Sequence, residues 1–273
     1  NLWWNYQHDF ISFQHTAEIA QQAENEPKLS RLLEFLAMQL VVFGPITTIL
    51  ILVTIRTSFS SEASKLLWSI FIPIFLVISV QALTARANIN WGAPAYITGS
   101  LIVAIWLAQT GSKRLVKLAV SINLVLAILF YHYSTLQNIA GVEPTKNNNP
   151  YTRISGWYEL GQSIQPYLDQ YPEAPIASES RKVLAYFGYY REPMDLYGRA
   201  LTFDDHTISQ YELLYPIDTS PATEHLVVSE HLTEKQLARH FKSAKTLTSQ
   251  SVKVTRDLTR TIHVTLVSGW LGR

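Results

Sequence analysis

The chain has no cysteine among its 273 residues, which excludes disulfide bonds and thiolate chemistry. It is also poor in charge, since Asp, Glu, Lys and Arg together make up 16% of the residues and the formal net charge is +1. No block of Lys and Arg occurs, so the sequence predicts no nucleic-acid partner and no other polyanionic one. The chain does not begin with Met and no signal-peptide pattern opens it, so we expect that membrane spans precede Asn1.

The charges that are present lie mostly in the second half of the chain. Residues 1–133 carry 14 charged side chains, whereas residues 134–273 carry 29 and contain no long apolar run. A helical membrane part followed by a water-soluble domain explains this division. We predict a transmembrane part over residues 1–134, a linker over residues 135–150 and a small soluble α/β domain over residues 151–273.

Four uncharged apolar stretches define the transmembrane part. About 20 apolar residues in a helix cross the hydrocarbon core, and only a helix satisfies its own backbone there. The sequence therefore predicts an α-helical polytopic membrane domain of about four transmembrane helices. The stretches are Phe35–Ile55, Leu66–Leu83, Gly92–Thr110 and Leu118–Ser134. The last is short enough either to tilt or to end at the interface, and prolines within the spans are expected to kink them or open their first turn.

The basic residues predict how the spans are oriented. Five Lys and Arg residues lie in the two loops that follow the first and third spans, and three lie on the opposite side. The side richer in Lys and Arg is cytoplasmic by the positive-inside rule. We therefore expect residues 1–34, residues 84–91 and the soluble domain on the outer face of the membrane.

Four short motifs follow one another along the chain. Residues 3–13 read WWNYQHDFISF, residues 32–46 LLEFLAMQLVVFGPI, residues 88–97 NINWGAPAYI and residues 155–160 SGWYEL. They resemble, in the same order, four elements of bacterial membrane glycosyltransferases of the dolichyl-phosphate-mannose–protein mannosyltransferase (PMT/ArnT-like) superfamily. Those elements are WN-x-QH-x-W-x-SF, E-F-x-x-x-Q-x-x-x-x-x-P, N-W-x-A-P-A-Y and G-W-x-x-L. Phe10 stands where the first one usually has Trp.

The resemblance implies the C-terminal part of a GT-C enzyme of the glycosyltransferase family 39 type. Such an enzyme moves a sugar from a polyprenyl-phosphate carrier to a lipid, glycan or protein on the periplasmic face of the bacterial inner membrane. The general base of the family is an acidic residue of the first outer loop, which we expect upstream of Asn1, so the chain alone is expected to be inactive. Its donor would be the lipid-linked sugar; the need for a divalent metal and the oligomeric state stay open.

Candidate substrate-binding residues lie in the predicted outer loops. Hydrogen-bond donors and cations stabilise a departing phosphate, and aromatic rings stack on sugars or line a lipid groove. The donor candidates are Asn5, Gln7, His8, Arg86, Asn88 and Asn90, and the aromatic candidates are Trp4, Trp91 and Tyr96.

Each candidate also has a structural interpretation. Trp at the end of a span commonly anchors the helix at the interface, and an arginine there snorkels toward water. Asn5 and Gln7 are as suited to tying loop backbone together as to touching a ligand. His8 and His15 lack a third ligand, so the sequence predicts no metal site.

Residues 151–273 alternate between helix and strand patterns, which predicts a small α/β layer. We expect helices over Gly156–Tyr171, Ser180–Tyr190 and Thr233–Phe241, and strands over Pro175–Ser178, His225–Ser229 and Ile262–Val267. The run of Asp204, Asp205 and His206 has the composition of a turn.

Two other functions are compatible with the sequence. A non-catalytic membrane protein whose outer α/β domain binds a glycan or protein partner is the main alternative. A transporter is disfavoured, because no charged residue lies within a span. Gln39, Gln81 and Asn123 are the polar residues inside the spans, and we expect them to form hydrogen bonds between helices.

Overall fold

A computed structural model describes the chain except for residues 22–26, 56–60, 86, 204–206, 208 and 273. The chain divides into two compact units, Asn1–Tyr133 and Ser134–Arg273, which are described separately below. Arg86, which the sequence suggested as a phosphate ligand, lies outside the described residues, as do Asp204, Asp205 and His206.

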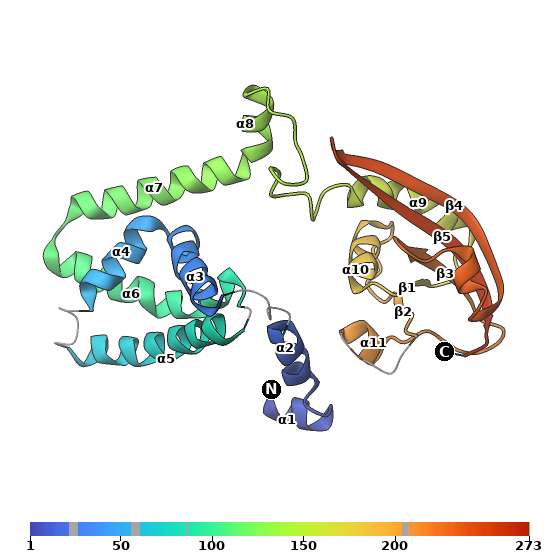
Figure 1. The fold of residues 1–273 in the computed structure, drawn as a ribbon, viewed down its shortest axis with the longest axis horizontal. Helices are drawn as coiled ribbons and strands as arrows, with labels where there is room; N and C mark the ends of the chain where they lie inside the picture. Colours follow the sequence, from blue (N-terminus) through green and yellow to red (C-terminus); the bar gives the residue numbers. More distant parts are fainter. Residues whose placement is uncertain (22–26, 56–60, 86, 204–206, 208, 273) are drawn as a thin grey trace. The chain divides into compact units, whose positions relative to one another are not determined.

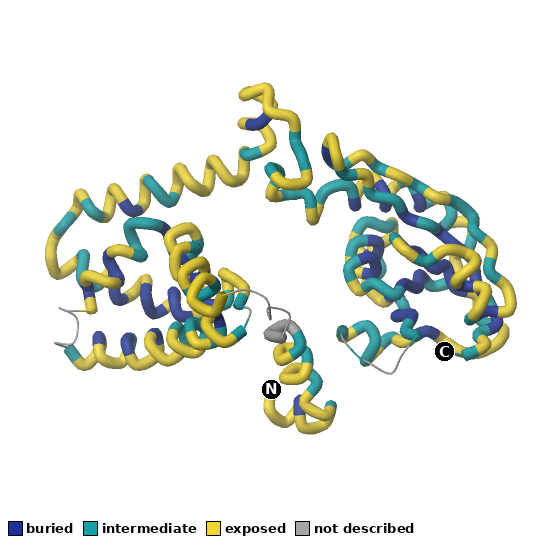
Figure 2. Tube along the Cα trace, viewed as in Figure 1, coloured by how far each residue is buried: buried dark blue, intermediate teal, exposed yellow. Residues whose placement is uncertain are grey.

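The described residues of the first unit form helices joined by short turns (Figure 1). The helices are α1 (Leu2–Gln7), α2 (Ile11–Gln21), α3 (Lys28–Val42), α4 (Pro45–Thr54), α5 (Glu62–Thr84), the 3-10 helix η1 (Ile89–Gly92), α6 (Ala93–Thr110) and α7 (Lys113–Tyr131). By length and composition, α5, η1 with α6, and α7 are able to cross a membrane. Figure 2 shows α5 and α7 exposed along most of their length, and their exposed side chains are largely apolar, as suits contact with lipid.

The first predicted span, Phe35–Ile55, is not one helix, which corrects the sequence-based prediction. α3 ends at Val42 and α4 begins at Pro45, and the two are bent by 110°. Gly44 between them has φ +89°, a conformation that glycine adopts without steric cost. Pro45 then occupies the first turn of α4, where its missing N–H breaks no helical hydrogen bond. The structure therefore has three helices that are able to cross a membrane, and a fourth span only if α3 and α4 together are counted as a single bent span.

The second unit is an α/β domain, as the sequence predicted. Its sheet has the order β2-β1-β3-β5-β4, in which β1 is parallel to β2 and β3, and β5 is antiparallel to β3 and β4. The strands are β1 (Ile176–Ser178), β2 (Arg199–Ala200), β3 (Glu224–Ser229), β4 (Phe241–Thr255) and β5 (Leu258–Trp270). The helices are α8 (Tyr133–Ile139), α9 (Trp157–Gln170), α10 (Arg181–Tyr190), α11 (Gln210–Leu214) and α12 (Glu234–Leu237).

The Gly-Trp motif anchors the main core of this domain. Trp157 opens α9 and is completely buried in the core that α9 and α10 form on one face of the sheet. Gly156 before it has φ +83°, and a Cβ there would lie 2.8 Å from Val254. Arg260 and Lys182 lie over the indole ring, 4.2 and 4.9 Å from its centroid. The motif thus has a packing role that follows from its geometry.

One prediction for this domain is wrong, and one strand was missed. The helix expected over Thr233–Phe241 ends at Leu237, and Phe241 is the first residue of β4. β4 itself was not predicted, although it is the longest strand that the structure describes. Only its first and last residues are buried. From Thr248 to Val254 half-buried and exposed positions alternate, but Thr248 and Gln250 are polar, so the apolar alternation that marks a strand in a sequence is confined to Val252 and Val254. Pairing with β5 along its length holds it in place.

A buried histidine makes the stability of this domain depend on pH. His225 in β3 is 1% exposed, and neither ring nitrogen has a hydrogen-bond partner. Burial, only partly opposed by the charge of Asp218, lowers the pKa of His225 from 6.5 to about 4. The unfolded chain binds the proton at a higher pH than the folded one. The contribution of neutral His225 to the free energy of unfolding is therefore fully present above pH 6.5. As the pH falls from 6.5 toward 4, up to about 3 kcal/mol of this free energy is lost.

His225→Leu is therefore expected to flatten the pH dependence of thermal unfolding between pH 6.5 and 4. Unfolding of the detergent-solubilised chain over this range checks it, with the exposed His231→Leu as control. If wild type and His225→Leu lose stability equally on acidification, His225 does not carry the effect.

Candidate functional site

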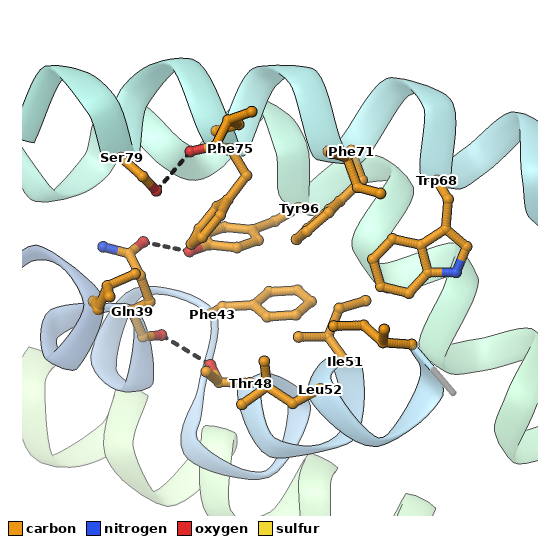
Figure 3. Close-up of a pocket in the computed structure, with 14 residues that line it drawn as sticks. Gln39, Phe43, Thr48, Ile51, Leu52, Trp68, Phe71, Phe75, Ser79 and Tyr96 are labelled. Atoms are coloured by element: carbon orange, nitrogen blue, oxygen red, sulfur yellow. Dashed lines mark hydrogen bonds between the residues drawn. The ribbon is translucent and has the colours of Figure 1, made fainter. Parts of the chain in front are cut away.

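A cavity of about 430 Å³ lies among α3, α4, α5 and α6 in the membrane part (Figure 3). We call it the α3–α6 slot. Its lining is almost wholly apolar and rich in aromatic rings, and Gln39, Thr48, Ser79 and Tyr96 bring the polar groups. The aromatic residues are Phe43, Trp68, Phe71, Phe75 and Tyr96. Such a cavity suits a long hydrocarbon chain that ends in a polar group.

Gln39 connects three elements at the polar part of the slot. Its side-chain amide donates to the carbonyl oxygens of Phe35 at 2.5 Å and of Ile89 at 3.4 Å, and its Oε1 accepts a hydrogen bond from the Tyr96 hydroxyl. Gly92 fits closely here, because a Cβ on it would lie 3.2 Å from Gln39 Oε1. Gln39 is thus the interhelical hydrogen-bonder that its place in a span predicted. Its bond to Tyr96 joins two of the four motifs.

The break between α3 and α4 shapes the slot. Phe43 lies at the break, and its ring stacks on that of Tyr96 with the centroids 4.2 Å apart. Thr48, in the first turns of α4, donates its hydroxyl to the Gln39 carbonyl oxygen at 3.0 Å. Figure 3 shows the rings of Phe43, Phe71, Phe75 and Tyr96 gathered between the two sides of the slot. A straight helix would not present Phe43 and Thr48 in this way.

The structure places the third-motif candidates beside the slot. Asn88 and Asn90 are exposed at the start of η1, and Trp91 is half-buried. η1 packs against α3, α5 and α6, so its position is fixed by the helices that form the slot. Within the described residues, neither asparagine side chain makes a hydrogen bond, which leaves both amides available to a ligand.

The first-motif candidates form a separate group on α1 and α2. Asn5 is 1% exposed; its amide donates to Asn1 Oδ1 at 2.9 Å, and its Oδ1 accepts from the Ser12 N–H at 3.3 Å. This is the loop-tying role weighed for it above. His8 Nδ1 lies 2.8 Å from the Trp4 carbonyl oxygen, and its ring stacks on that of Trp4 at 4.3 Å.

Gln7 is exposed at the end of α1. Among the described residues, no hydrogen bond or ring stacking joins the first-motif group to Asn88, Asn90 or Trp91. The structure therefore brings Tyr96 into the slot and the η1 residues next to it, and leaves the first-motif residues as a group of their own.

Sequence reasoning missed the α5 side of the slot. Trp68, Phe71 and Phe75 follow the i, i+3, i+7 spacing that puts side chains on one helix face. That spacing was the available signal, but an apolar span contains many such patterns. In the described ranges, no group of three or more His, Asp or Glu residues is arranged to hold a metal ion.

Comparison with curated proteins finds lipid A galacturonosyltransferase RgtD of Rhizobium johnstonii. It is 37% identical over 133 residues, which are 48% of this chain and 28% of the relative, so the match spans less than a third of that protein's length. No protein-family profile and no solved structure matches the chain. The apolar helices and this similarity together make the chain a membrane protein related to a glycosyltransferase.

Proposed function

We propose that the chain belongs to a PMT/ArnT-like membrane glycosyltransferase that takes its sugar from a polyprenyl-phosphate carrier. The similarity to a lipid A galacturonosyltransferase carries this proposal. The order of the four motifs supports the same superfamily. Transfer would take place on the periplasmic face of the inner membrane, and the distribution of basic residues predicts that the loop before α6 and the C-terminal domain lie on this face.

The slot supports a lipid-linked donor. A polyprenyl chain is a long flexible hydrocarbon, and the aromatic lining matches it in polarity. The carrier phosphate would then lie near η1, where Asn88 and Asn90 offer uncommitted amide donors. Arg86, two residues earlier in the sequence, would add a positive charge. Donors aimed at the phosphate stabilise it as it leaves the anomeric carbon, which is what the reaction requires.

The relative's name supplies the acceptor hypothesis. RgtD is named for transfer of galacturonic acid to lipid A, a saccharide carried on a lipid. We propose an acceptor of that general kind, a lipid-anchored or free glycan, for the protein to which this chain belongs. The chain supplies the donor cavity and the C-terminal domain, and the proposal assigns no general base to it.

Transfer by the full-length protein in proteoliposomes tests the proposal. The same radiolabelled sugar is offered on undecaprenyl phosphate in one set of vesicles and on a nucleotide in another, with extracted envelope glycolipid as acceptor. We expect label to move only from the lipid-linked donor, and empty vesicles give the background. Transfer from the nucleotide sugar alone, or from neither donor, would contradict the proposal.

A further inference from the structure

The β4–β5 hairpin extends past the rest of its sheet. β3 pairs with His263–Ser268 of β5, so among the described residues the part of β5 before His263 has β4 as its only strand neighbour (Figure 1). On one face of this extension, Val252 and Ile262 pack against the core of α9 and α10. The opposite face carries polar side chains and is the surface that matters here.

Three cross-strand pairs make up that face, and we call them the hydroxyl ladder. Ser249 Oγ lies 2.7 Å from His263 Nδ1, and Ser251 Oγ lies 2.8 Å from Thr261 Oγ1. Lys253 stands opposite Thr259 in the next pair toward the hairpin tip. Ser249, Ser251, Lys253 and Thr259 are exposed, and Thr261 and His263 are half-exposed. Nothing in the described chain therefore covers the ladder.

Charge is divided unevenly within this domain. Residues 231–273, which include the hairpin, carry eight Lys and Arg against two Asp and Glu. Residues 134–230 carry six Lys and Arg against thirteen Asp and Glu. The prediction of no polyanionic partner was based in part on the net charge of the whole chain. That net charge of +1 averages over the two regions and does not show this division. Two of these charges are matched by carboxylates, since Arg256 pairs with Glu143 and Arg260 with Glu230, so the charge that the ladder itself offers to an anionic ligand is that of Lys253.

The chemistry of the ladder selects among anionic ligands. Neighbouring side chains on one face of paired strands stand about 5 Å apart, so the ladder offers a regular array of hydroxyl donors and acceptors. It exposes no apolar side chain that a protein partner or an acyl chain would bury. Ser249 is hydrogen-bonded to Nδ1 of His263, so the other ring nitrogen, Nε2, is available to bind a ligand. Lys253 has no ion-pair partner among the described residues. A ligand with sugar hydroxyls beside an acidic group matches these hydroxyl groups, imidazole nitrogen and ammonium group.

We propose that the hydroxyl ladder binds an anionic saccharide, a sugar chain bearing carboxylate or phosphate groups. Lys253 pairs with the acidic group, while His263, Ser251 and Thr261 bind sugar hydroxyls. The identification of this saccharide as part of the acceptor rests on the proposed function; the binding itself does not. The surface lies outside the donor slot and serves to hold the acceptor.

Calorimetric titration of the detergent-solubilised whole chain tests this surface. The probes are trigalacturonate, the neutral maltotriose and inorganic phosphate. Lys253→Glu is expected to weaken trigalacturonate binding about tenfold or more, because a charge-assisted contact is lost, and His263→Ala is expected to weaken it several-fold, because a hydrogen bond to a sugar hydroxyl is lost. Lys245→Glu is the matched control, since it is an exposed residue of the same strand paired with Leu266, whose side chain packs against the core of α9 and α10 on the other face.

Each outcome decides the proposal. Loss of binding in Lys253→Glu and His263→Ala with near wild-type binding in Lys245→Glu supports it, provided that all three unfold at the wild-type temperature. Equal loss in both Lys→Glu variants means unspecific attraction, and equal affinity for phosphate or maltotriose means that no anionic saccharide is recognised; either overturns it. If the chain binds the saccharide but the full-length protein transfers no sugar, the ladder proposal is supported and the glycosyltransferase proposal is contradicted. If sugar is transferred but the saccharide does not bind, the ladder proposal is contradicted and the glycosyltransferase proposal is supported.

Discussion

Gly44→Ala is expected to destabilise the bend between α3 and α4 and to lower the yield of natively folded membrane part. Gly44 has φ +89°, which costs a residue with a side chain about 1–3 kcal/mol. A Cβ at this position would also lie 2.0 Å from Asn123 Oδ1 on α7, far inside van der Waals contact. The bend of 110° between α3 and α4 and its packing on α7 both depend on this glycine. The yield of monodisperse protein in detergent and its unfolding temperature measure the loss.

Two companion variants separate the causes. Gly111 also has a positive φ, +63°, but its ψ of 17° puts it in the left-handed helical region, where a side chain costs less than at the φ +89°, ψ 144° of Gly44, and a Cβ there would meet nothing within 4 Å. We expect it to fold with a small drop in unfolding temperature. Adding Asn123→Ala to Gly44→Ala removes the overlap and should recover part of the yield. If Gly44→Ala behaved like Gly111→Ala, the packing of the bend against α7 would be wrong.

Gln39→Ala is expected to lower sugar transfer by the full-length protein about 100-fold, the scale of loss that a misplacement of about 1 Å produces. The change removes the amide that ties α3 to Ile89 of η1 and to Tyr96. η1 carries Asn88 and Asn90, so their amides would no longer be held beside the slot. Because the loss concerns donor placement, we expect the KM for the lipid-linked sugar to rise and the dependence on acceptor concentration to stay as in wild type.

Gln81→Ala is the matched control for Gln39→Ala. It removes the same kind of side chain from a membrane helix, α5, and Gln81 does not line the slot. Transfer in this variant should stay within a few-fold of wild type, with the unfolding temperature reported for both. A similar loss in the two variants would mean that Gln39 acts only through general stability.

The sequence predicted the apolar helices well because burial in lipid leaves a strong mark on composition. It could not show that the first span is broken, since Phe43, Gly44 and Pro45 interrupt the helix without interrupting the apolar run. Gly-Pro was a signal for a kink, but an angle of 110° depends on what packs into the bend, here Asn123 of α7.

The α/β domain shows the same limit in another form. β3 was predicted at the right residues because all of its residues after Glu224 are buried. Apart from His225 and Ser229, these residues are also apolar. β4 was missed because its exposed Lys, Ser and Thr residues pair with β5 without forming a core of their own. The polar composition that hid the strand is also what makes the ladder a binding surface.

The slot could be predicted only in part. Tyr96 was suggested for a lipid groove from its motif, and Gln39 was recognised as an interhelical hydrogen-bonder. That the two meet follows from the packing of α3 against α5 and η1, which no local pattern encodes. Phe71 and Phe75 enter through α5, an element that none of the four motifs includes.

Photo-crosslinking of the lipid carrier tests the central claim most directly. A polyprenyl phosphate with a diazirine on its isoprenoid chain is bound to the full-length protein in proteoliposomes. The sample is then irradiated, and the labelled peptides are identified by mass spectrometry. We predict label on Phe71, Phe75 and Leu76 of α5, which line the slot, removed by an excess of unlabelled carrier and reduced in Gln39→Ala. Label that spreads over the lipid-facing side of α7 and resists competition would contradict a carrier site in the α3–α6 slot.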